Sequence, residues 1–160
     1  MNPREDRARA SIAVAVPPAE AFRIFTEEID RWWRAGLRYR VGGGRAVVLL
    51  EPGVGGRLLQ RVGEGEGATI VVTGEVLQWQ PPELLVLRWR AANFAPDEWT
   101  RVEVRFTPQG QGTFVTVEHS GWAAIRPDHP ARHGEAPARF LARLGMWWAD
   151  LLRSLQGSAR

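Results

Sequence analysis

The sequence predicts an α+β fold in which an antiparallel sheet of about six to seven strands wraps around one long C-terminal helix. Three observations lead to this prediction. Residues 137–156 carry a continuous apolar face at helical spacing. Residues 46–120 read as a series of strands separated mainly by glycine- and proline-containing turns. One strand and one short helix precede this region, and such antiparallel sheets have one wet face and one covered face.

The N-terminal part predicts a tail, a strand and a helix. Residues 1–9 are polar and are expected to form a disordered tail, which leaves a single domain over residues 10–157. Residues 11–16 are typical of a strand, and Pro17 and Pro18 stop it. Pro18 suits the first turn of a helix, and apolar side chains then recur at helical spacing from residue 19 to residue 33. Gly36 is expected to end this helix.

The central part predicts strands over residues 46–51, 57–62, 68–79, 84–90, 99–107 and 113–120. Three of the connections are rich in glycine, which favours turns. Pro81-Pro82 joins the strands predicted over residues 68–79 and 84–90. Because proline lacks a backbone donor and a two-residue primed turn needs positive φ, this connection is expected to be wider and stiff.

The C-terminal helix is predicted from one apolar face, formed by Phe140, Leu141, Leu144, Trp147, Trp148, Leu151, Leu152 and Leu155. We expect this face to cover the apolar face of the sheet. Gly145 lies in the middle of the helix, at a cost of about 1 kcal/mol relative to alanine. It either leaves room beside a cavity or lets the helix pack closely on the sheet. Gly157 is expected to cap the end.

The composition argues against several classes of function. The chain has no cysteine, which excludes disulfides, thiolate nucleophiles and cysteine-ligated metals. All 21 basic residues are arginines scattered among 18 acids, unlike the concentrated basic face of a nucleic-acid-binding protein. The N-terminus lacks an apolar signal core, and the aliphatic run over residues 46–50 is too short to span a bilayer. We expect a cytoplasmic protein with no nucleic-acid partner and no membrane span.

Five short motifs resemble one known superfamily. They are Leu50-Glu-Pro-Gly-Val-Gly-Gly-Arg57, Gly74-Glu-Val-Leu-Gln-Trp-Gln-Pro-Pro82, Leu85-Val-Leu-Arg-Trp89, Thr100-Arg-Val-Glu-Val-Arg-Phe-Thr-Pro108 and Glu118-His-Ser-Gly-Trp122. Together they resemble the SRPBCC superfamily of START, birch-pollen-allergen and polyketide-cyclase proteins. Within it, they look like the bacterial branch named after the activator of the heat-shock-protein-ninety ATPase. The resemblance covers roughly residues 10–155.

The resemblance implies a helix-grip fold, in which the sheet curls around the last helix and leaves a cavity between them. Such a cavity implies a small hydrophobic or aromatic ligand. We expect no cofactor, and a monomer or homodimer. A stiff proline corner would help to hold neighbouring strands at that curvature. The family name implies no ATPase activity, because the eukaryotic namesake stimulates a chaperone and does not itself hydrolyse ATP.

The candidate cavity residues combine inward strand positions with aromatic and apolar positions of the helices: Trp32, Trp33, Glu51, Gln60, Trp89, Phe106, His119, Trp122, Phe140, Leu144, Trp147 and Trp148. The eight tryptophans are the most unusual feature of the composition. Large aromatic side chains line pockets and stack on flat ligands, and they also fill cores. Five of them meeting around one space would form a wall: Trp32, Trp33, Trp89, Trp147 and Trp148.

His119 is the candidate for catalysis, because strand alternation places it inward with Val115 and Val117. An inward histidine either bonds or exchanges protons with a ligand, or is a core imidazole that tethers the following turn to a backbone carbonyl. Gln60 shares the covered face; relatives often have a carboxylate there, so a glutamine weakens an acid–base role. Glu51 either faces the cavity mouth or pairs with a nearby arginine on the surface.

No metal site is expected. His129 and His133 have i,i+4 spacing, but Pro130 and Gly134 argue against the regular helix that would bring them together.

Three functions remain as hypotheses. The first is binding of a small hydrophobic or aromatic molecule. The second is an enzyme of the cyclase or hydratase type, with His119 as acid–base and Glu51 or Gln60 orienting the substrate. The third is a co-chaperone-like interaction module that uses charges on the outer face of the sheet.

Overall fold

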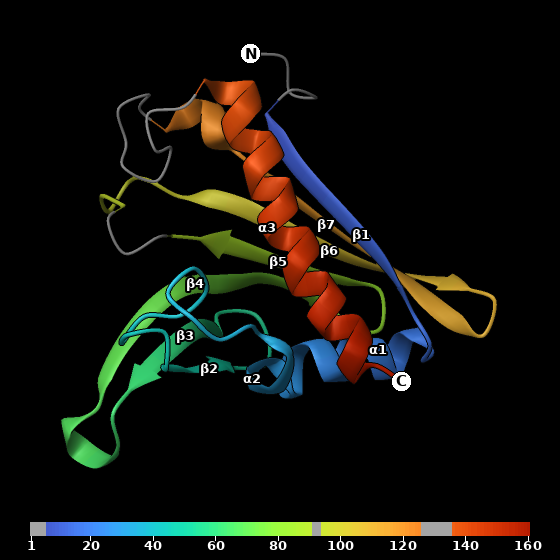
Figure 1. The fold of residues 1–160 in the computed structure, drawn as a ribbon, viewed down its shortest axis with the longest axis horizontal. Coiled ribbons are helices and arrows are strands. Elements are labelled where there is room, and N and C mark those ends of the chain that lie inside the picture. The colour runs from blue at the N-terminus through green and yellow to red at the C-terminus, as the bar shows by residue number, and fades with distance from the viewer. Residues whose placement is uncertain (1–5, 91–93, 126–135) are drawn as a thin grey trace.

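A computed structural model describes residues 6–90, 94–125 and 136–160. The described residues form one curved antiparallel sheet with a long helix against its inner face (Figure 1). The strand order is β1-β7-β6-β5-β4-β3-β2, so every strand after β1 lies beside its neighbour in the chain. The strands are β1 (Arg7–Val14), β2 (Val47–Leu50), β3 (Arg57–Val62), β4 (Thr69–Gln80), β5 (Leu84–Trp89), β6 (Thr100–Gln109) and β7 (Gly112–Ser120). The predicted α+β class, with its wrapped sheet and terminal helix, is confirmed.

The predicted N-terminal helix is in fact two helices, α1 (Pro18–Glu27) and α2 (Ile29–Trp32). The break is at Glu28, whose φ of −106° and ψ of 25° lie outside the helical region. Glu28 bonds to Arg23 at 2.7 Å and to Arg31 at 2.9 Å, so its carboxylate ties the two helices together. The break also turns Trp32 inward, and its indole N–H donates to the carbonyls of Ile24 and Phe25.

Both ends of the domain differ from the prediction. Strand β1 begins at Arg7 and pairs with β7, which corrects the expected tail at residues 7–9. At the other end, α3 (Pro137–Ser158) includes Gly157, which was expected to cap it. The cap is instead Ala159, which is buried and whose carbonyl accepts a hydrogen bond from the backbone N–H of Ala15. The helix end is therefore fixed by tertiary contacts with the β1–α1 connection, which no local pattern reveals.

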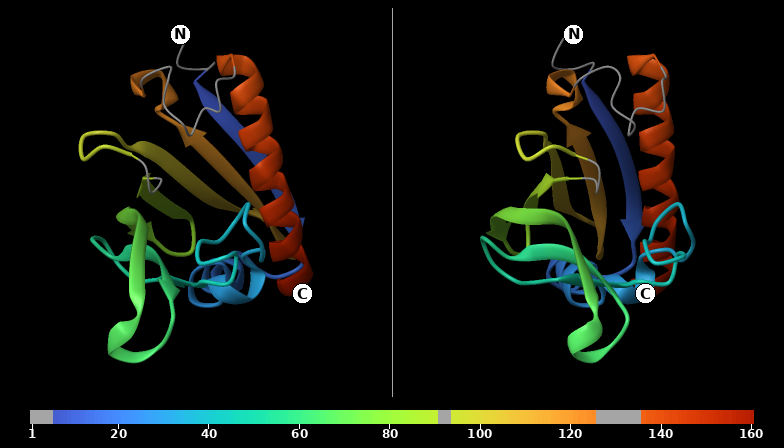
Figure 2. Two further views of the ribbon diagram at one scale, coloured as in Figure 1. Left: turned by 60° about the vertical axis from the view of Figure 1, so that its left-hand side comes forward. Right: turned by 90° about the vertical axis from the view of Figure 1, so that its left-hand side faces the viewer.

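Two irregularities lie on either side of β4. The β3–β4 register shifts between Leu58 and Leu59, and the β4–β5 register shifts between Val76 and Gln78. Such bulges bend strands and increase their twist. Figure 2 shows the result: β1 runs along α3, whereas β4 and β3 curve away from it. Residues 81–83 join β4 to β5, one residue more than a two-residue turn, as expected of the proline corner.

The core lies between the inner face of the sheet and helices α1 and α3. Val102, Val104 and Phe106 of β6 are buried there, as their alternation predicts. A Cβ atom at Gly145 would lie 3.3 Å from the carbonyl oxygen of Arg9 in β1. This glycine therefore permits close packing of α3 on β1, the second of its two predicted roles. None of the described helices has both the length and the apolar character needed to cross a bilayer.

Candidate functional site

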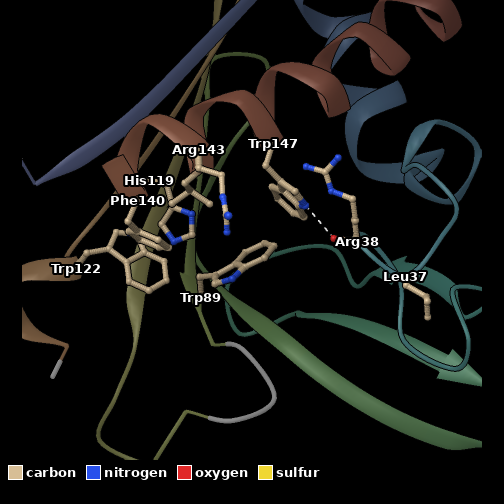
Figure 3. A pocket seen from close by; sticks show the side chains of 9 residues that line it. Leu37, Arg38, Trp89, His119, Trp122, Phe140, Arg143 and Trp147 are labelled. Carbon is tan, nitrogen blue, oxygen red and sulfur yellow. Dashed lines mark hydrogen bonds between the residues drawn. The ribbon is translucent and has the colours of Figure 1, made fainter. Parts of the chain in front are cut away.

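A pocket of about 660 Å³ opens beside the N-terminal half of α3 (Figure 3). One wall comes from α3, a second from the ends of β5 and β7 and the turn that follows β7, and a third from the loop of residues 34–46. The lining residues are Leu37, Arg38, Trp89, His119, Trp122, Phe140, Arg143, Leu144 and Trp147. Four of these nine are tryptophan or phenylalanine and two more are leucine, so apolar side chains make up most of the lining.

Four tryptophans form one cluster at the inner end of this pocket. They are Trp33, Trp89, Trp147 and Trp148, and all six pairs of rings are in contact, with centroid separations of 5.1 to 6.3 Å. Trp33 and Trp148 are buried and fill the core behind the pocket. Trp89 and Trp147 are only partly buried and turn part of their surface to the pocket. The cluster is therefore core on one side and pocket wall on the other.

His119 is held by hydrogen bonds at both ring nitrogens. The indole N–H of Trp148 lies 3.2 Å from Nδ1, which must accept, and Nε2 lies 2.8 Å from the Thr100 hydroxyl. That hydroxyl in turn donates to the carbonyl of Trp89. This chain of donors fixes the neutral imidazole with its proton on Nε2. Burial, which disfavours the charged form, lowers the pKa of His119 to about 3.

Arg40 anchors the loop of residues 34–46, which supplies the third wall of the pocket. The Arg40 guanidinium binds the Asp30 carboxylate at 2.5 Å and donates to the carbonyls of Asp30, Trp33, Arg34 and Ala46. The side chain is only 10% exposed, although it belongs to a surface loop. One arginine fork therefore organises the backbone at both ends of the loop.

Three further side chains hold the middle of the same loop. Trp147 donates its indole N–H to the carbonyl of Arg38 at 2.8 Å, and Trp33 donates to the carbonyl of Tyr39 at 3.0 Å. The Gln60 amide oxygen accepts from the backbone N–H of Val41 at 2.7 Å. The Tyr39 ring also stacks on Trp147, with centroids 5.6 Å apart. The loop and α3 are thus joined directly at the pocket.

Six of the twelve predicted cavity residues line this pocket: Trp89, His119, Trp122, Phe140, Leu144 and Trp147. The other six lie outside its lining. Trp32 is fully buried beneath α1, Phe106 packs on Phe22 and Phe25, and Trp33 and Trp148 lie behind the pocket surface. Gln60 is buried as well, but its amide serves the loop backbone. Their contact with a ligand stays a prediction that this geometry does not support.

Glu51 is the sixth residue outside the lining, and it forms the surface pair that was one of its two predicted roles. Its carboxylate receives two bonds from the Arg57 guanidinium, at 2.7 and 2.9 Å. These bonds lower the pKa of Glu51 to about 2.

We expect Glu51→Gln to leave ligand affinity unchanged and to shift the urea midpoint only slightly, because exposed pairs contribute little. A clear loss of affinity in a titration with an apolar fluorescent dye would instead indicate that Glu51 contacts the ligand.

Sequence reasoning missed three lining residues, Leu37, Arg38 and Arg143. Leu37 and Arg38 belong to a loop without periodicity, so no pattern indicates where their side chains lie. Arg143 is not part of the apolar face from which the C-terminal helix is predicted. Its position four residues before Trp147 was a usable signal, because residues at i and i+4 of a helix lie on the same side. His129 and His133 lie outside the described residues.

A curved antiparallel sheet that grips a C-terminal helix, with a pocket between them, defines the helix-grip fold of the SRPBCC superfamily. Within it, the chain belongs to the family described as Activator of Hsp90 ATPase homolog 1-like protein, whose model matches residues 15–145. The predicted superfamily and branch are confirmed. A comparison with curated proteins found no match.

Solved structures of the same fold come from proteins with different descriptions. Protein MLL2253 from Mesorhizobium loti is 22% identical, with a TM-score of 0.62 and 94% of each chain covered. PFC0360w, an HSP90 activator from Plasmodium falciparum, is 18% identical, with a TM-score of 0.65 and 96% of this chain and 95% of that chain covered. At these identities the likeness shows the fold alone. The anthrahydroquino-gamma-pyrone synthase Txn09, solved in complex with SUM, is 28% identical, with a TM-score of 0.58 and 96% and 97% covered.

Proposed function

We propose that this protein binds a flat hydrophobic or aromatic small molecule in the pocket beside α3. The observation that supports this most is the lining itself, in which Trp89, Trp122, Phe140 and Trp147 surround a space of about 660 Å³. Pockets for small molecules commonly hold about 300–1,000 Å³ and are mostly apolar with few polar groups. Aromatic rings in such a lining offer stacking and edge contacts to a planar ligand.

The rigidity of the site also supports a binding role. His119 is fixed by Thr100 and Trp148, and the indole N–H of Trp147 is fixed by the loop backbone. Side chains that are already ordered lose little conformational freedom when a ligand arrives, so less of the contact energy is lost on binding. A preformed wall of this kind suits recognition of a rigid, planar molecule.

The contacts of the three groups proposed for catalysis count against the enzymatic hypothesis. His119 uses both nitrogens within the protein, and its low pKa leaves it neutral near pH 7. Gln60 holds the backbone of the 34–46 loop, and Glu51 is paired with Arg57 away from the pocket lining. The polar atoms of all three are therefore engaged by partners within the protein, which disfavours proton exchange with a molecule in this pocket.

The relation to Txn09 gives independent support for a small-molecule ligand. That synthase has the same fold over nearly the full length of both chains and was solved with a bound compound.

The co-chaperone hypothesis has weaker support. On the outer face of the sheet, Glu118 pairs with Arg7 and Arg9, and Glu103 pairs with Arg101 and Arg105, so these acids are already partnered.

Titration with N-phenyl-1-naphthylamine, an uncharged dye that fluoresces in apolar sites, tests the proposal. We expect saturable binding to the wild-type protein, and about tenfold weaker binding to Leu144→Trp, because the larger side chain occupies part of the pocket. Met146→Trp is the matched control, since Met146 lies on the same helix but is 70% exposed and outside this lining. Urea unfolding of each variant confirms that it is folded.

The proposal fails if the wild-type protein shows no saturable dye response, or if both tryptophan variants weaken binding equally. Equal weakening would mean that the dye attaches to the helix surface and not to the pocket. If binding behaves as expected, mass spectrometry of small molecules that co-purify with the protein is the way to identify the natural ligand.

A further inference from the structure

We infer that the outer face of β2, β3 and β4 is a self-association surface, on which two copies of this chain pack face to face around a two-fold axis. The centre of this surface is a row of three side chains from Leu49, Leu59 and Val72, which are cross-strand neighbours in the register of the sheet. The row lies on the side of the sheet opposite to the core and the pocket, so the inference does not depend on the proposed function.

This surface is apolar, although it lies on the outside of the sheet. In the central row, Leu49 is 37% exposed and Val72 is 45% exposed, and Leu59 between them is buried even though it points outward. Ile70, which follows along β4, is also 45% exposed. Three of the seven exposed large apolar side chains among the described residues therefore gather here. Contiguous apolar surface of this kind marks sites of interaction.

A partner could instead add a strand to the free edge of β2, but hydrogen bonds within the protein close that edge. The backbone N–H of Val48 donates to the Asp30 carboxylate at 2.9 Å. The carbonyl of Ala46, just before β2, accepts from the Arg40 guanidinium at 2.9 Å. Edge strands whose backbone groups are already occupied do not pair readily with another chain. The face of the sheet is therefore the part of this region that is open to a partner.

The two sides of the central row carry opposite charges. On one side, Arg61 has no ion-pair partner among the described residues, and its buried Nε has no hydrogen-bond acceptor there. On the other side, the Glu75 carboxylate also has no ion-pair partner among them. Arg57, its neighbour in β3, bonds to Glu51 instead, and the guanidinium of Arg88 in β5 lies 4.9 Å from the centre of a tryptophan ring.

These opposite charges make the surface complementary to itself. A two-fold axis that runs along the central row, in the plane of contact, places the Arg61 side of each copy over the Glu75 side of the other. Arg61 then meets Glu75 together with the Glu51–Arg57 pair, a group with one negative charge in excess. The contact forms twice, once at each end of the interface. Because the surface itself supplies both charges at the required spacing, a second copy is the partner that fits it.

Sedimentation equilibrium tests this inference. We expect the wild-type protein to form a dimer with a dissociation constant on the order of 10 µM, because the apolar centre is small and its rim is polar. Val72→Glu should weaken the dimer about tenfold or more, since it introduces a carboxylate into the apolar row of both copies. Met146→Glu is the matched control, because Met146 is 70% exposed on α3, and it should leave the dissociation constant unchanged.

A pair of charge reversals tests the two-fold arrangement. Arg61→Glu and Glu75→Arg should each weaken self-association about tenfold, because each brings like charges together at both ends of the interface. An equimolar mixture of the two variants should recover the wild-type affinity, since every contact between the two different chains then joins opposite charges. Urea unfolding of each variant checks that it is folded.

A wild-type protein that stays monomeric at about 100 µM, tenfold above the expected dissociation constant, overturns the inference. In that outcome the apolar face is left to a different partner. A dimer that persists unchanged in Val72→Glu also overturns it, because the contact then lies elsewhere on the molecule. So does a mixture of the two charge-reversal variants that associates no better than either variant alone.

Discussion

Replacing His119 with glutamine should remove a large part of the acid sensitivity of this protein. Burial lowers the pKa of His119 to about 3 in the folded state, against about 6.5 in an unfolded chain. Between these values the unfolded state binds one proton more than the folded state, so stability is lost as the pH falls. The expected loss is about 1.4 kcal/mol per pH unit, or roughly 3 kcal/mol by pH 4.

Urea unfolding at several pH values between 7.5 and 4 measures this effect. At pH 7.5 the variant should be less stable than the wild type by about 2 kcal/mol, because glutamine cannot reproduce both bonds, to Trp148 and to Thr100. As the pH falls, the wild type should lose this advantage. Carboxylates such as Glu51 titrate in both proteins, so the difference between the two curves isolates His119. Parallel curves over the whole range would show that His119 is not the buried neutral base described here.

Replacing Arg40 with lysine should loosen the pocket and destabilise the fold together. Lysine keeps the charge but has no planar fork, and the wild-type guanidinium serves Asp30 and four backbone carbonyls. We expect the free energy of unfolding to fall by about 1–3 kcal/mol, since partly buried carbonyls and the half-exposed Asp30 carboxylate lose charge-assisted hydrogen bonds. We also expect dye affinity to fall about tenfold, because Leu37 and Arg38 would no longer be held at the pocket.

The matched change Arg45→Lys tests whether this effect belongs to the loop in general. Arg45 is exposed in the same loop, so the Arg45→Lys variant should match the wild type in both stability and dye affinity. Stability and affinity are read from urea unfolding and from the neutral dye. If Arg40→Lys lowers stability but leaves affinity intact, the loop does not need its anchor in order to form the pocket wall.

The fold was predictable because its main patterns are local. Alternation along β6 and β7 and the apolar face of α3 reflect burial on one side, which is a property of each segment taken alone. The predictions that failed depended on distant partners. The helix break at Glu28 is held by Arg23 and Arg31, and the extension of α3 through Gly157 depends on Ala15 at the other end of the chain.

The site was predictable to a smaller extent for the same reason. Strand alternation correctly predicted that His119 and Gln60 point inward, but not what their polar atoms would bind. A sequence pattern assigns a side chain to a face, whereas function depends on whether its hydrogen-bonding capacity is already used. For His119 the deciding partner is Trp148, which is 29 residues away. For Gln60 it is the backbone of a loop whose composition gives no structural signal.

The contact among all four rings of the tryptophan cluster has an optical consequence. Indole rings at separations of 5.1 to 6.3 Å couple strongly through their intense far-ultraviolet transition, so the far-ultraviolet circular dichroism of this protein should contain exciton bands from Trp33, Trp89, Trp147 and Trp148. Excitation energy absorbed anywhere in the cluster also reaches the two rings that border the pocket. The intrinsic tryptophan fluorescence should therefore report, without an added label, on any molecule that contacts Trp89 or Trp147.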